Sequence, residues 1–260
     1  VRKIINNENV DDIDLATNLT PPEISEALKK KNIKFYETGI THGTITAIIN
    51  KTKFEITSLR EDVLTDGRHA KVKFSKDWSE DASRRDFTIN AIYANINGEL
   101  FDPFCGKKDL EEGEVKFIGE ADKRVKEDYL RILRYVRFFL NYSKKNHDKK
   151  VLSLIRKNLD GISNISSERL LDEFKKLVIS NGLSKLYKDP NSLEIISLIF
   201  PQFKSFQVLK NLNSYAEKNF FKFDFIFLLS LLVIDGSDNV DYFIYKFKLS
   251  KKDQTRIKFI

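Results

Sequence analysis

Three residue types are scarce in this chain. Among its 260 residues there is no methionine, one tryptophan and one cysteine. The lone cysteine, Cys105, excludes an internal disulfide framework and fits a reducing compartment, so we expect a cytoplasmic protein. No apolar run approaches the ~20 residues that a membrane-spanning helix needs, because the longest one, residues 223–234, contains Asp224. We therefore expect no membrane partner.

Charged residues, in contrast, are plentiful and unbalanced. The chain has 45 lysines and arginines against 38 aspartates and glutamates, which gives a net charge of +7. Such an excess attracts polyanions, because each phosphate that a cation neutralises releases a counterion. A lysine-rich surface that is merely solvated has the same composition, so charge alone leaves both interpretations open. With 41% hydrophobic residues, a chain of this length has room for two domains, each with its own core.

Two aspartates separated by one residue, Asp12 and Asp14, stand in a run that is typical of a β-strand. Side chains alternate along a strand, so both carboxylates face one side while Ile13 and Leu15 face the other, towards a core. Like charges held this close repel unless a cation lies between them, and oxygen ligands suit Mg²⁺. A solvated acidic turn is the alternative. Further along, Glu55 alternates with apolar neighbours; it is either a third carboxylate at the same sheet edge or an exposed strand glutamate.

Residues 20–58 predict one helix and three strands. Thr20 to Glu23 form a capping box with proline at the first helical position, so a helix begins there and ends near Lys31. The expected strands are residues 34–38, 43–50 and 53–58, which form an antiparallel meander. Residues 60–73 have Asp66-Gly67 at their centre and scattered charge, which is typical of a mobile loop.

Donors suited to phosphate are concentrated between residues 84 and 91. Arg84 and Arg85 precede Asp86, Thr88 and Asn90. The guanidinium groups are suited to phosphate oxygens, and the neighbouring polar side chains are suited to a ribose hydroxyl. A structural ion-pair cluster is the alternative interpretation.

The clearest helix is expected at residues 120–142, where apolar residues recur at helical spacing. Its polar face carries Asp128 and Arg131, three residues apart, which is the spacing of an ordinary helix ion pair. There is also a chemical interpretation. A carboxylate accepts from an exocyclic amine while a guanidinium donates to ring acceptors, so the pair matches the pairing edge of cytosine or adenine. Uracil and guanine would leave polar groups unpaired and be rejected.

The second half predicts amphipathic helices at residues 148–159, 167–180, 192–199, 206–218 and 224–234. Phenylalanines are frequent there, among them Phe220, Phe221, Phe223, Phe225 and Phe227. They are either stacking platforms for RNA bases or the core of small packed helices, and core is our prediction.

Taken together, these motifs resemble the bacterial-type (class II) CCA-adding tRNA nucleotidyltransferases and their relatives, the bacterial poly(A) polymerases. Five matches occur in family order over about residues 1–180. They are a metal-binding motif at 1–2 and 12–17, a ribose-selecting motif at 84–91, a hinge motif at 102–110, an amino-acid template at 127–131, and a neck-bracing helix motif at 165–176.

The resemblance implies an α/β head with a polymerase β-like nucleotidyltransferase fold, followed by an all-α neck and body. We place the head at residues 1–115, the neck with its base-recognition helix at 116–180, and the body at 181–260. The implied reaction is Mg²⁺-dependent addition of C, C and A to a tRNA 3′ end from CTP and ATP. The implied catalytic residues are Asp12, Asp14 and Glu55, of which Asp12 and Asp14 also bind the metal. The implied nucleotide-binding residues are Arg2, Arg84, Arg85, Asp86, Asn90, Glu127, Asp128, Arg131 and Arg134.

Two departures from the family pattern keep other functions open. The family pattern has Gly-Gly before the Val-Arg pair and aspartate after it, whereas this chain begins at Val1 and has Lys3 at the aspartate position. Family members also continue beyond the length seen here, so we expect this chain to be part of a longer protein. The alternatives are an A-adding or poly(A)-synthesising enzyme of the same family, and a non-catalytic RNA-binding module. Residues 60–73 resemble the family's lever for switching from C to A, which favours CCA addition. The sequence indicates no oligomeric state.

Overall fold

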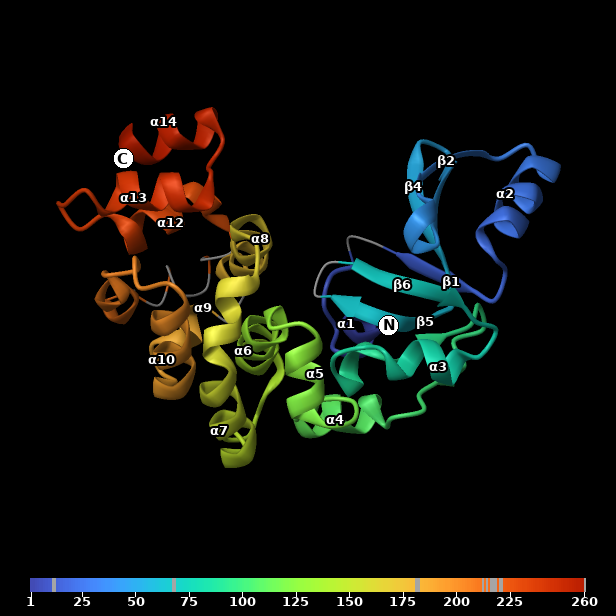
Figure 1. Ribbon diagram of the computed structural model, residues 1–260, viewed down its shortest axis with the longest axis horizontal. Coiled ribbons are helices and arrows are strands. Elements are labelled where there is room, and N and C mark those ends of the chain that lie inside the picture. The colour runs from blue at the N-terminus through green and yellow to red at the C-terminus, as the bar shows by residue number, and fades with distance from the viewer. Residues whose placement is uncertain are drawn as a thin grey trace. The chain divides into compact units, whose positions relative to one another are not determined.

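The computed structural model describes residues 1–10, 13–66, 69–180, 183–211, 213, 215, 219 and 222–259 (Figure 1). The chain divides into two compact units. Unit 1 consists of Val1–Glu112 and Lys116–Glu120, and unit 2 consists of Gly113–Val115 and Ala121–Ile260. Every strand of the described residues lies in unit 1, whereas the described elements of unit 2 are helices.

The main sheet of unit 1 has four strands in the order β1-β4-β3-β2. They are β1 (Asp14–Thr17), β2 (Lys34–Gly39), β3 (Thr44–Ile49) and β4 (Thr52–Ser58). β1 pairs with β4 in parallel, and the other neighbours are antiparallel, so the sheet is mixed and the predicted meander is confirmed. Asn50 and Lys51 join β3 to β4 with φ angles of 50° and 67°, as a two-residue hairpin turn of type I′ requires.

Helix α2 (Pro21–Lys30) packs on β2 and β3 (Figure 1). It begins with the predicted capping box, in which the Glu23 carboxylate accepts a hydrogen bond from the Thr20 backbone N–H at 2.7 Å. Ile24 and Leu28 pack against the buried residues of β3. Because side chains alternate along a strand, every second residue of β3 and β4 projects from the opposite face of the sheet.

The predicted burial of Ile13 and Leu15 is wrong. Ile13 is 54% exposed and Leu15 is 42% exposed. Leu15 pairs with Ile56 and so lies on the same face as α2. However, β1 is an edge strand with one neighbour, and α2 packs over β2 and β3 at the other side of the sheet.

The prediction of a loop at residues 60–73 is also wrong. This stretch contains β5 (Arg60–Asp66) and β6 (His69–Phe74), which pair as an antiparallel hairpin (Figure 1). The sequence Asp66-Gly67 is typical of a loop, but Asp-Gly between strand-forming stretches is also a strong hairpin signal. Scattered charge misled the prediction, because alternating charges are compatible with a two-stranded ribbon.

The remaining elements of unit 1 are short. They are α1 (Arg2–Ile5), η1 (Ile40–His42), α3 (Trp78–Ser83), η2 (Thr88–Asn90), β7 (Tyr93–Ala94), β8 (Leu100–Phe101) and α4 (Gly106–Glu112). A Cβ atom at Gly106 would overlap the carbonyl of Thr88, so only glycine permits this approach of α4 to η2. The Thr88 hydroxyl donates to Asp109 at 2.7 Å, and the other oxygen of that carboxylate accepts from Lys116 at 2.6 Å.

The described elements of unit 2 are α5 (Ala121–Glu127), α6 (Leu130–Tyr142), α7 (Lys149–Asn158), η3 (Leu159–Asn164), α8 (Ser167–Val178), α9 (Leu183–Leu186), α10 (Pro190–Ile199), η4 (Phe206–Asn211), α12 (Phe225–Val233), α13 (Asn239–Phe247) and α14 (Lys251–Phe259). The predicted helices at 148–159, 167–180, 192–199 and 224–234 are confirmed to within two residues. The prediction at 206–218 falls partly on the 3-10 turn η4 and partly outside the described residues. Helices α9, α13 and α14 were not predicted.

The single helix predicted at residues 120–142 is broken at Asp128-Tyr129 into α5 and α6. The apolar stripe does not reveal the break, because both helices bury residues at compatible spacing. Tyr129 lies so close to Gly161 of η3 that a Cβ atom at Gly161 would overlap its ring. Tertiary packing of this tyrosine therefore accompanies the interruption, and Asp128 lies at a helix junction rather than within a helix.

The aromatic core of unit 2 differs from the predicted one. Phe174, Phe200, Phe203, Phe243 and Phe247 are buried and pack ring against ring. In contrast, Phe223 and Phe227 are each 37% exposed, so assigning these two to the core was wrong. Phe220 and Phe221 lie outside the described residues.

Candidate active site

Two of the predicted catalytic residues, Asp14 and Glu55, share one row of the main sheet. Asp14 is the register partner of Glu55 across the parallel pair of β1 and β4, and register partners project from the same face. This is the face opposite α2, because Thr46, the partner of Glu55 in β3, alternates with the buried residues under that helix. Both carboxylates are exposed. The third predicted carboxylate, Asp12, lies outside the described residues.

No group of three or more histidine, cysteine, aspartate or glutamate side chains within the described part of the chain is placed to hold a metal ion. The pair of Asp14 and Glu55 offers carboxylate oxygens, which are the donors that Mg²⁺ prefers. The donor chemistry of this sheet face therefore fits the predicted metal.

Three predicted nucleotide-binding residues, Arg2, Asn90 and Asp86, form a chain of hydrogen bonds. Arg2 donates to the side-chain oxygen of Asn90, and the Asn90 amide donates to Asp86 at 2.8 Å. The same oxygen of Asp86 accepts from the backbone N–H of Phe87 at 2.9 Å. Asp86 is buried, so its carboxylate orients the amide of Asn90.

The paired arginines Arg84 and Arg85 are held by Asp81, a residue that the sequence analysis missed. Asp81 accepts from Arg84 at 2.7 Å, from Arg85 at 3.1 Å and from the Tyr93 hydroxyl at 2.6 Å. Arg85 also lies over the ring of Tyr93, 5.4 Å from its centroid. The alternative interpretation of a structural ion-pair cluster is thus part of the observed geometry. A buried acid three and four residues before two arginines was the signal that could have revealed it.

Burial and charge act against each other in this cluster. Burial raises the pKa of the Asp81 carboxyl, but Arg84, the Tyr93 hydroxyl and Arg85 outweigh it and bring the pKa below its usual value. Burial raises the pKa of Tyr93 to about 12; Arg85 opposes this rise and Asp81 adds to it. Asp81 is therefore ionised and Tyr93 is a neutral hydrogen-bond donor at neutral pH.

The predicted template residues Asp128 and Arg131 are not paired with each other. Asp128 accepts from Arg169 of α8 at 2.7 Å through Oδ2, and from the backbone N–H of Leu130 at 3.2 Å through Oδ1. Because the helix is broken at Asp128, its carboxylate is turned towards α8 instead of lying beside Arg131. The prediction of an i, i+3 pair is therefore corrected, and Arg169 is a contact that sequence spacing did not reveal.

Arg131 instead pairs with Glu127, another predicted nucleotide-binding residue. Its Nη1 donates to Glu127 Oε2 at 2.7 Å and to the backbone carbonyl of Arg124 at 2.7 Å. Arg124 donates to the same glutamate oxygen at 2.5 Å. Glu127 therefore holds both arginines across the junction of α5 and α6.

The last predicted nucleotide-binding residue, Arg134, lies 3.6 Å from the carboxylate of Glu173. Glu173 is buried in α8 and also accepts from Arg137 at 2.5 Å. Lys176 is 3.6 Å away from the same oxygen that faces Arg134. This cluster joins α6 to α8, so Arg134 contributes to helix packing.

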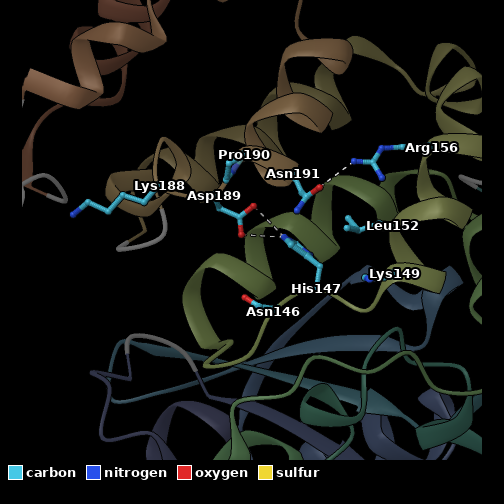
Figure 2. A pocket seen from close by; sticks show the side chains of 9 residues that line it. All are labelled: Asn146, His147, Lys149, Leu152, Arg156, Lys188, Asp189, Pro190 and Asn191. Atoms are coloured by element: carbon cyan, nitrogen blue, oxygen red, sulfur yellow. Dashed lines mark hydrogen bonds and ion pairs between the residues drawn. The ribbon is translucent and has the colours of Figure 1, made fainter.

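A pocket of about 580 Å³ lies in unit 2, where α7 and α10 begin (Figure 2). His147 forms part of its wall, with its Nε2 atom 3.1 Å from Asp189 and its Nδ1 atom 3.0 Å from the Tyr135 hydroxyl. Its ring stacks on Phe139 at 3.4 Å between centroids. Figure 2 shows His147 and Asp189 pointing toward one another, so these two side chains satisfy each other and we assign the pocket no role.

Comparison with known proteins identifies the family. Residues 1–116 match the poly A polymerase head domain, and residues 147–207 match the probable RNA and SrmB-binding site of polymerase A. The human mitochondrial CCA tRNA nucleotidyltransferase 1 is 45% identical over 189 residues, covering 72% of this chain and 44% of that protein. The chain belongs to the tRNA nucleotidyltransferase and poly(A) polymerase family. The family predicted from the sequence motifs is confirmed.

Another relative of this chain is the CCA-adding enzyme of Lactobacillus johnsonii. It is 38% identical over 192 residues, covering 72% of this chain and 46% of that protein. The chain thus spans less than half the length of these curated relatives.

Solved structures of the same family share the fold. The Bacillus stearothermophilus CCA-adding enzyme in complex with CTP matches 88% of this chain and 62% of that chain, with 23% identity and a TM-score of 0.64. A tRNA nucleotidyltransferase complexed with a primer tRNA and an incoming ATP analog matches 99% of this chain and 77% of that chain, with 22% identity and a TM-score of 0.75. The predicted polymerase β-like head followed by an all-α region is therefore confirmed. None of the described helices is both long and apolar enough to cross a membrane.

Proposed function

We propose that this protein adds C, C and A to the 3′ end of tRNA, using CTP and ATP and releasing pyrophosphate. The observation that carries the proposal is the parallel register that sets Asp14 beside Glu55 on the sheet face left open by α2. Relatives named CCA tRNA nucleotidyltransferase and CCA-adding enzyme support the choice of substrate. We further propose that it acts in the cytoplasm, and that the head, neck and body have the boundaries given above.

Asp14 and Glu55 would hold Mg²⁺ together with Asp12, which stands two residues before Asp14 in the sequence. A metal ion held there would supply a lower pKa for the attacking 3′-hydroxyl and positive charge beside the leaving pyrophosphate. The chain itself positions the two carboxylates. Two carboxylates fixed on adjacent strands keep their separation without a further conformational change, because backbone hydrogen bonds set the strand spacing.

The arginine-rich segment would bind the nucleotide's phosphates and sugar. Arg84 and Arg85 are held by a shared carboxylate of Asp81, so less side-chain freedom is lost when they bind a phosphate. Asn90 is fixed between Arg2 and Asp86, which suits an amide that must hydrogen-bond a ribose hydroxyl in one orientation.

Asp128 and Arg131 would select the base although each has a protein partner. Each carboxylate oxygen can accept two hydrogen bonds, and each oxygen of Asp128 accepts one, from Leu130 or Arg169. Arg131 uses Nη1 for both of its contacts, which leaves the donors on Nη2 and Nε. A carboxylate acceptor and guanidinium donors thus stay available to cytosine or adenine, on side chains that their partners hold in place.

The test is incorporation of labelled CTP and ATP, with Mg²⁺, into tRNA transcripts that end before CCA or after CC, and into an unrelated poly(A) primer. We expect two C and one A on the first transcript, one A on the second and none on the poly(A) primer. Addition of A to the CC-ended transcript alone would indicate an A-adding enzyme. Long A tails on every primer would indicate a poly(A) polymerase.

Site variants separate catalysis from binding. Asp14→Asn and Glu55→Gln are expected to lower incorporation by at least 100-fold while RNA binding is retained, because neutral amides are poor ligands for Mg²⁺. Asp172→Asn, which changes an exposed aspartate of α8, is the matched control and should retain activity. Full activity of Asp14→Asn would refute the proposed catalytic site. RNA binding by the wild-type protein with no incorporation at all would instead identify a non-catalytic RNA-binding module.

A further inference from the structure

The open face of the main sheet carries more than the two carboxylates. Because the strands are in register, Asp14, Glu55, Thr46 and Tyr36 form one row across β1, β4, β3 and β2. Tyr36 is 45% exposed. It stands on the strand farthest from β1 in this sheet, so an exposed aromatic ring and the candidate catalytic carboxylates share one surface.

The neighbouring row adds two lysines. Lys34 of β2 and Lys53 of β4 are both register partners of Ile48, so the two lysines flank β3 on the same open face. Both are exposed, and neither forms an ion pair with any residue of the described chain. The ammonium group of Lys34 lies over the ring of Tyr36, 5.4 Å from its centroid. Positive charge without an acidic partner beside an exposed ring is complementary to a phosphate next to a base.

We propose that Tyr36, Lys34 and Lys53 bind the single-stranded 3′ end of the RNA primer just upstream of the nucleotide that reacts. This inference rests on the proposed function, since it assumes that the 3′-hydroxyl lies at Asp14 and Glu55. Tyr36 stacks on a base, and the two lysines contact the phosphates that flank it. Sheets that bind single-stranded RNA commonly combine an aromatic platform with cations in this way.

The spacing of the strands fits this placement. Neighbouring strands lie about 4.8 Å apart, so Tyr36 stands roughly 10 Å from Glu55 and 14 Å from Asp14. Stacked bases are about 3.4 Å apart. A ring at this distance is within reach of the nucleotides that precede the reacting 3′ end.

The residues of β2 on the other face of the sheet pack against α2. Glu37, between Tyr36 and the end of β2, accepts from the hydroxyl of Ser25 in α2 at 2.7 Å, and Phe35 packs on the core beneath that helix. Odd-numbered residues of β2 thus face α2, and the even-numbered Lys34 and Tyr36 face away from it. The ring is directed by the strand, not by a flexible loop.

The experiment measures binding and needs no catalysis. The probe is an RNA hairpin ending in unpaired A-C-C, with 2-aminopurine in place of the A; stacking on an aromatic ring quenches its fluorescence. We expect the wild-type protein and Tyr36→Phe to quench the probe, because both retain the ring. Tyr36→Ala should lose the quenching and bind about 10-fold more weakly, within the range for loss of one base–aromatic stack. Tyr245→Ala, which removes an exposed tyrosine of α13, is the matched control and should behave as wild type.

The lysines are tested by the salt dependence of the same binding. Lys34→Gln and Lys53→Gln should each reduce the slope of log K against log salt by about 0.7. Lys31→Gln, at the end of α2 on the covered side of the sheet, should leave the slope unchanged. Equal quenching by wild type and Tyr36→Ala, or equal slopes for all three lysine variants, would overturn the inference even if CCA addition is found. If Tyr36→Ala loses the quenching and Asp14→Asn loses incorporation, both proposals are supported. If Tyr36→Ala loses the quenching but the wild-type protein incorporates no nucleotide, only the proposed function is refuted.

Discussion

Replacing Asp81 by asparagine tests whether one buried carboxylate holds the arginines that we assign to phosphate binding. The substitution keeps the size of the side chain and removes its charge. In the wild-type protein the Asp81 side chain is 2% exposed, and it pairs with Arg84, which is 16% exposed, and with Arg85, which is 36% exposed. Two guanidinium groups would therefore lose an ionic partner in a largely buried place.

The expected loss of stability follows from these exposures. Removing one partner of a buried ion pair costs about 3–5 kcal/mol. The share from Arg85 is reduced, because over a third of that side chain is in contact with solvent, which screens the pair. Asparagine also still accepts a hydrogen bond from Tyr93. We therefore expect Asp81→Asn to lower the free energy of unfolding of unit 1 by about 2–3 kcal/mol.

The chain contains its own reporter for this measurement. Its one tryptophan, Trp78, is the first residue of α3 and lies edge-on to Tyr93, with ring centroids 5.3 Å apart. Urea unfolding followed by tryptophan fluorescence therefore reports on the structure around Asp81. Asp172→Asn is the control and should change the free energy by less than about 0.5 kcal/mol, as surface substitutions usually do.

Enzyme kinetics provide a second readout. Arginines that are less firmly held should bind nucleotide phosphates less well, so the KM for CTP and ATP should rise in Asp81→Asn more than kcat falls. A free energy of unfolding within 0.5 kcal/mol of wild type, together with unchanged KM values, would refute the assignment of Asp81 as the residue that positions Arg84 and Arg85.

Two further predictions concern unit 2. Arg169→Ala should free the Asp128 carboxylate and reduce the preference for CTP and ATP over UTP and GTP about 10-fold, the equivalent of about 1.4 kcal/mol. Misincorporation assays measure this preference. Unchanged selectivity would show that Arg169 does not position Asp128. Burial lowers the pKa of His147, against the opposing effect of Asp189, so the folded protein binds fewer protons than the unfolded one below the ordinary histidine pKa of 6.5. The stability of unit 2 should therefore be fully present above pH 6.5 and fall as the pH is lowered, and His147→Asn should flatten this dependence in urea titrations between pH 5 and 8, whereas His42→Asn should not.

Local patterns in the sequence predicted much of unit 1. The capping box at Thr20 and the alternation in residues 34–58 are short-range signals, and the helix and strands that they predicted are present. Alternation left open whether Glu55 shares a sheet edge with Asp14 or is only an exposed strand glutamate, and the register pairing puts both side chains on one face. The exposure of Leu15 was not predictable in this way. Burial depends on which strand lies at the edge and where α2 packs, and neither is encoded within the strand itself.

Contacts between distant residues explain most of what the sequence did not reveal. Asp81, Glu173 and Arg169 each hold a candidate site residue. Arg169 and Glu173 lie in the motif at residues 165–176, but spacing within that motif does not reveal their partners. Their roles depend on which charges the fold brings together, as when α8 brings Arg169 to Asp128, 41 residues earlier in the chain. Spacing predicts neighbours within a helix, and it fails where the helix is interrupted.

The break at Asp128-Tyr129 shows how one local change alters the chemistry of the site. In a continuous helix, Asp128 and Arg131 would neutralise each other, and a base would have to separate them before binding. In the observed structure, Arg169 and Glu127 are their partners instead, so the acceptor and the donors are held separately. A base that binds both need not break an ion pair between them. The interruption, which the apolar stripe did not reveal, thus supports our proposal that these two side chains read a base.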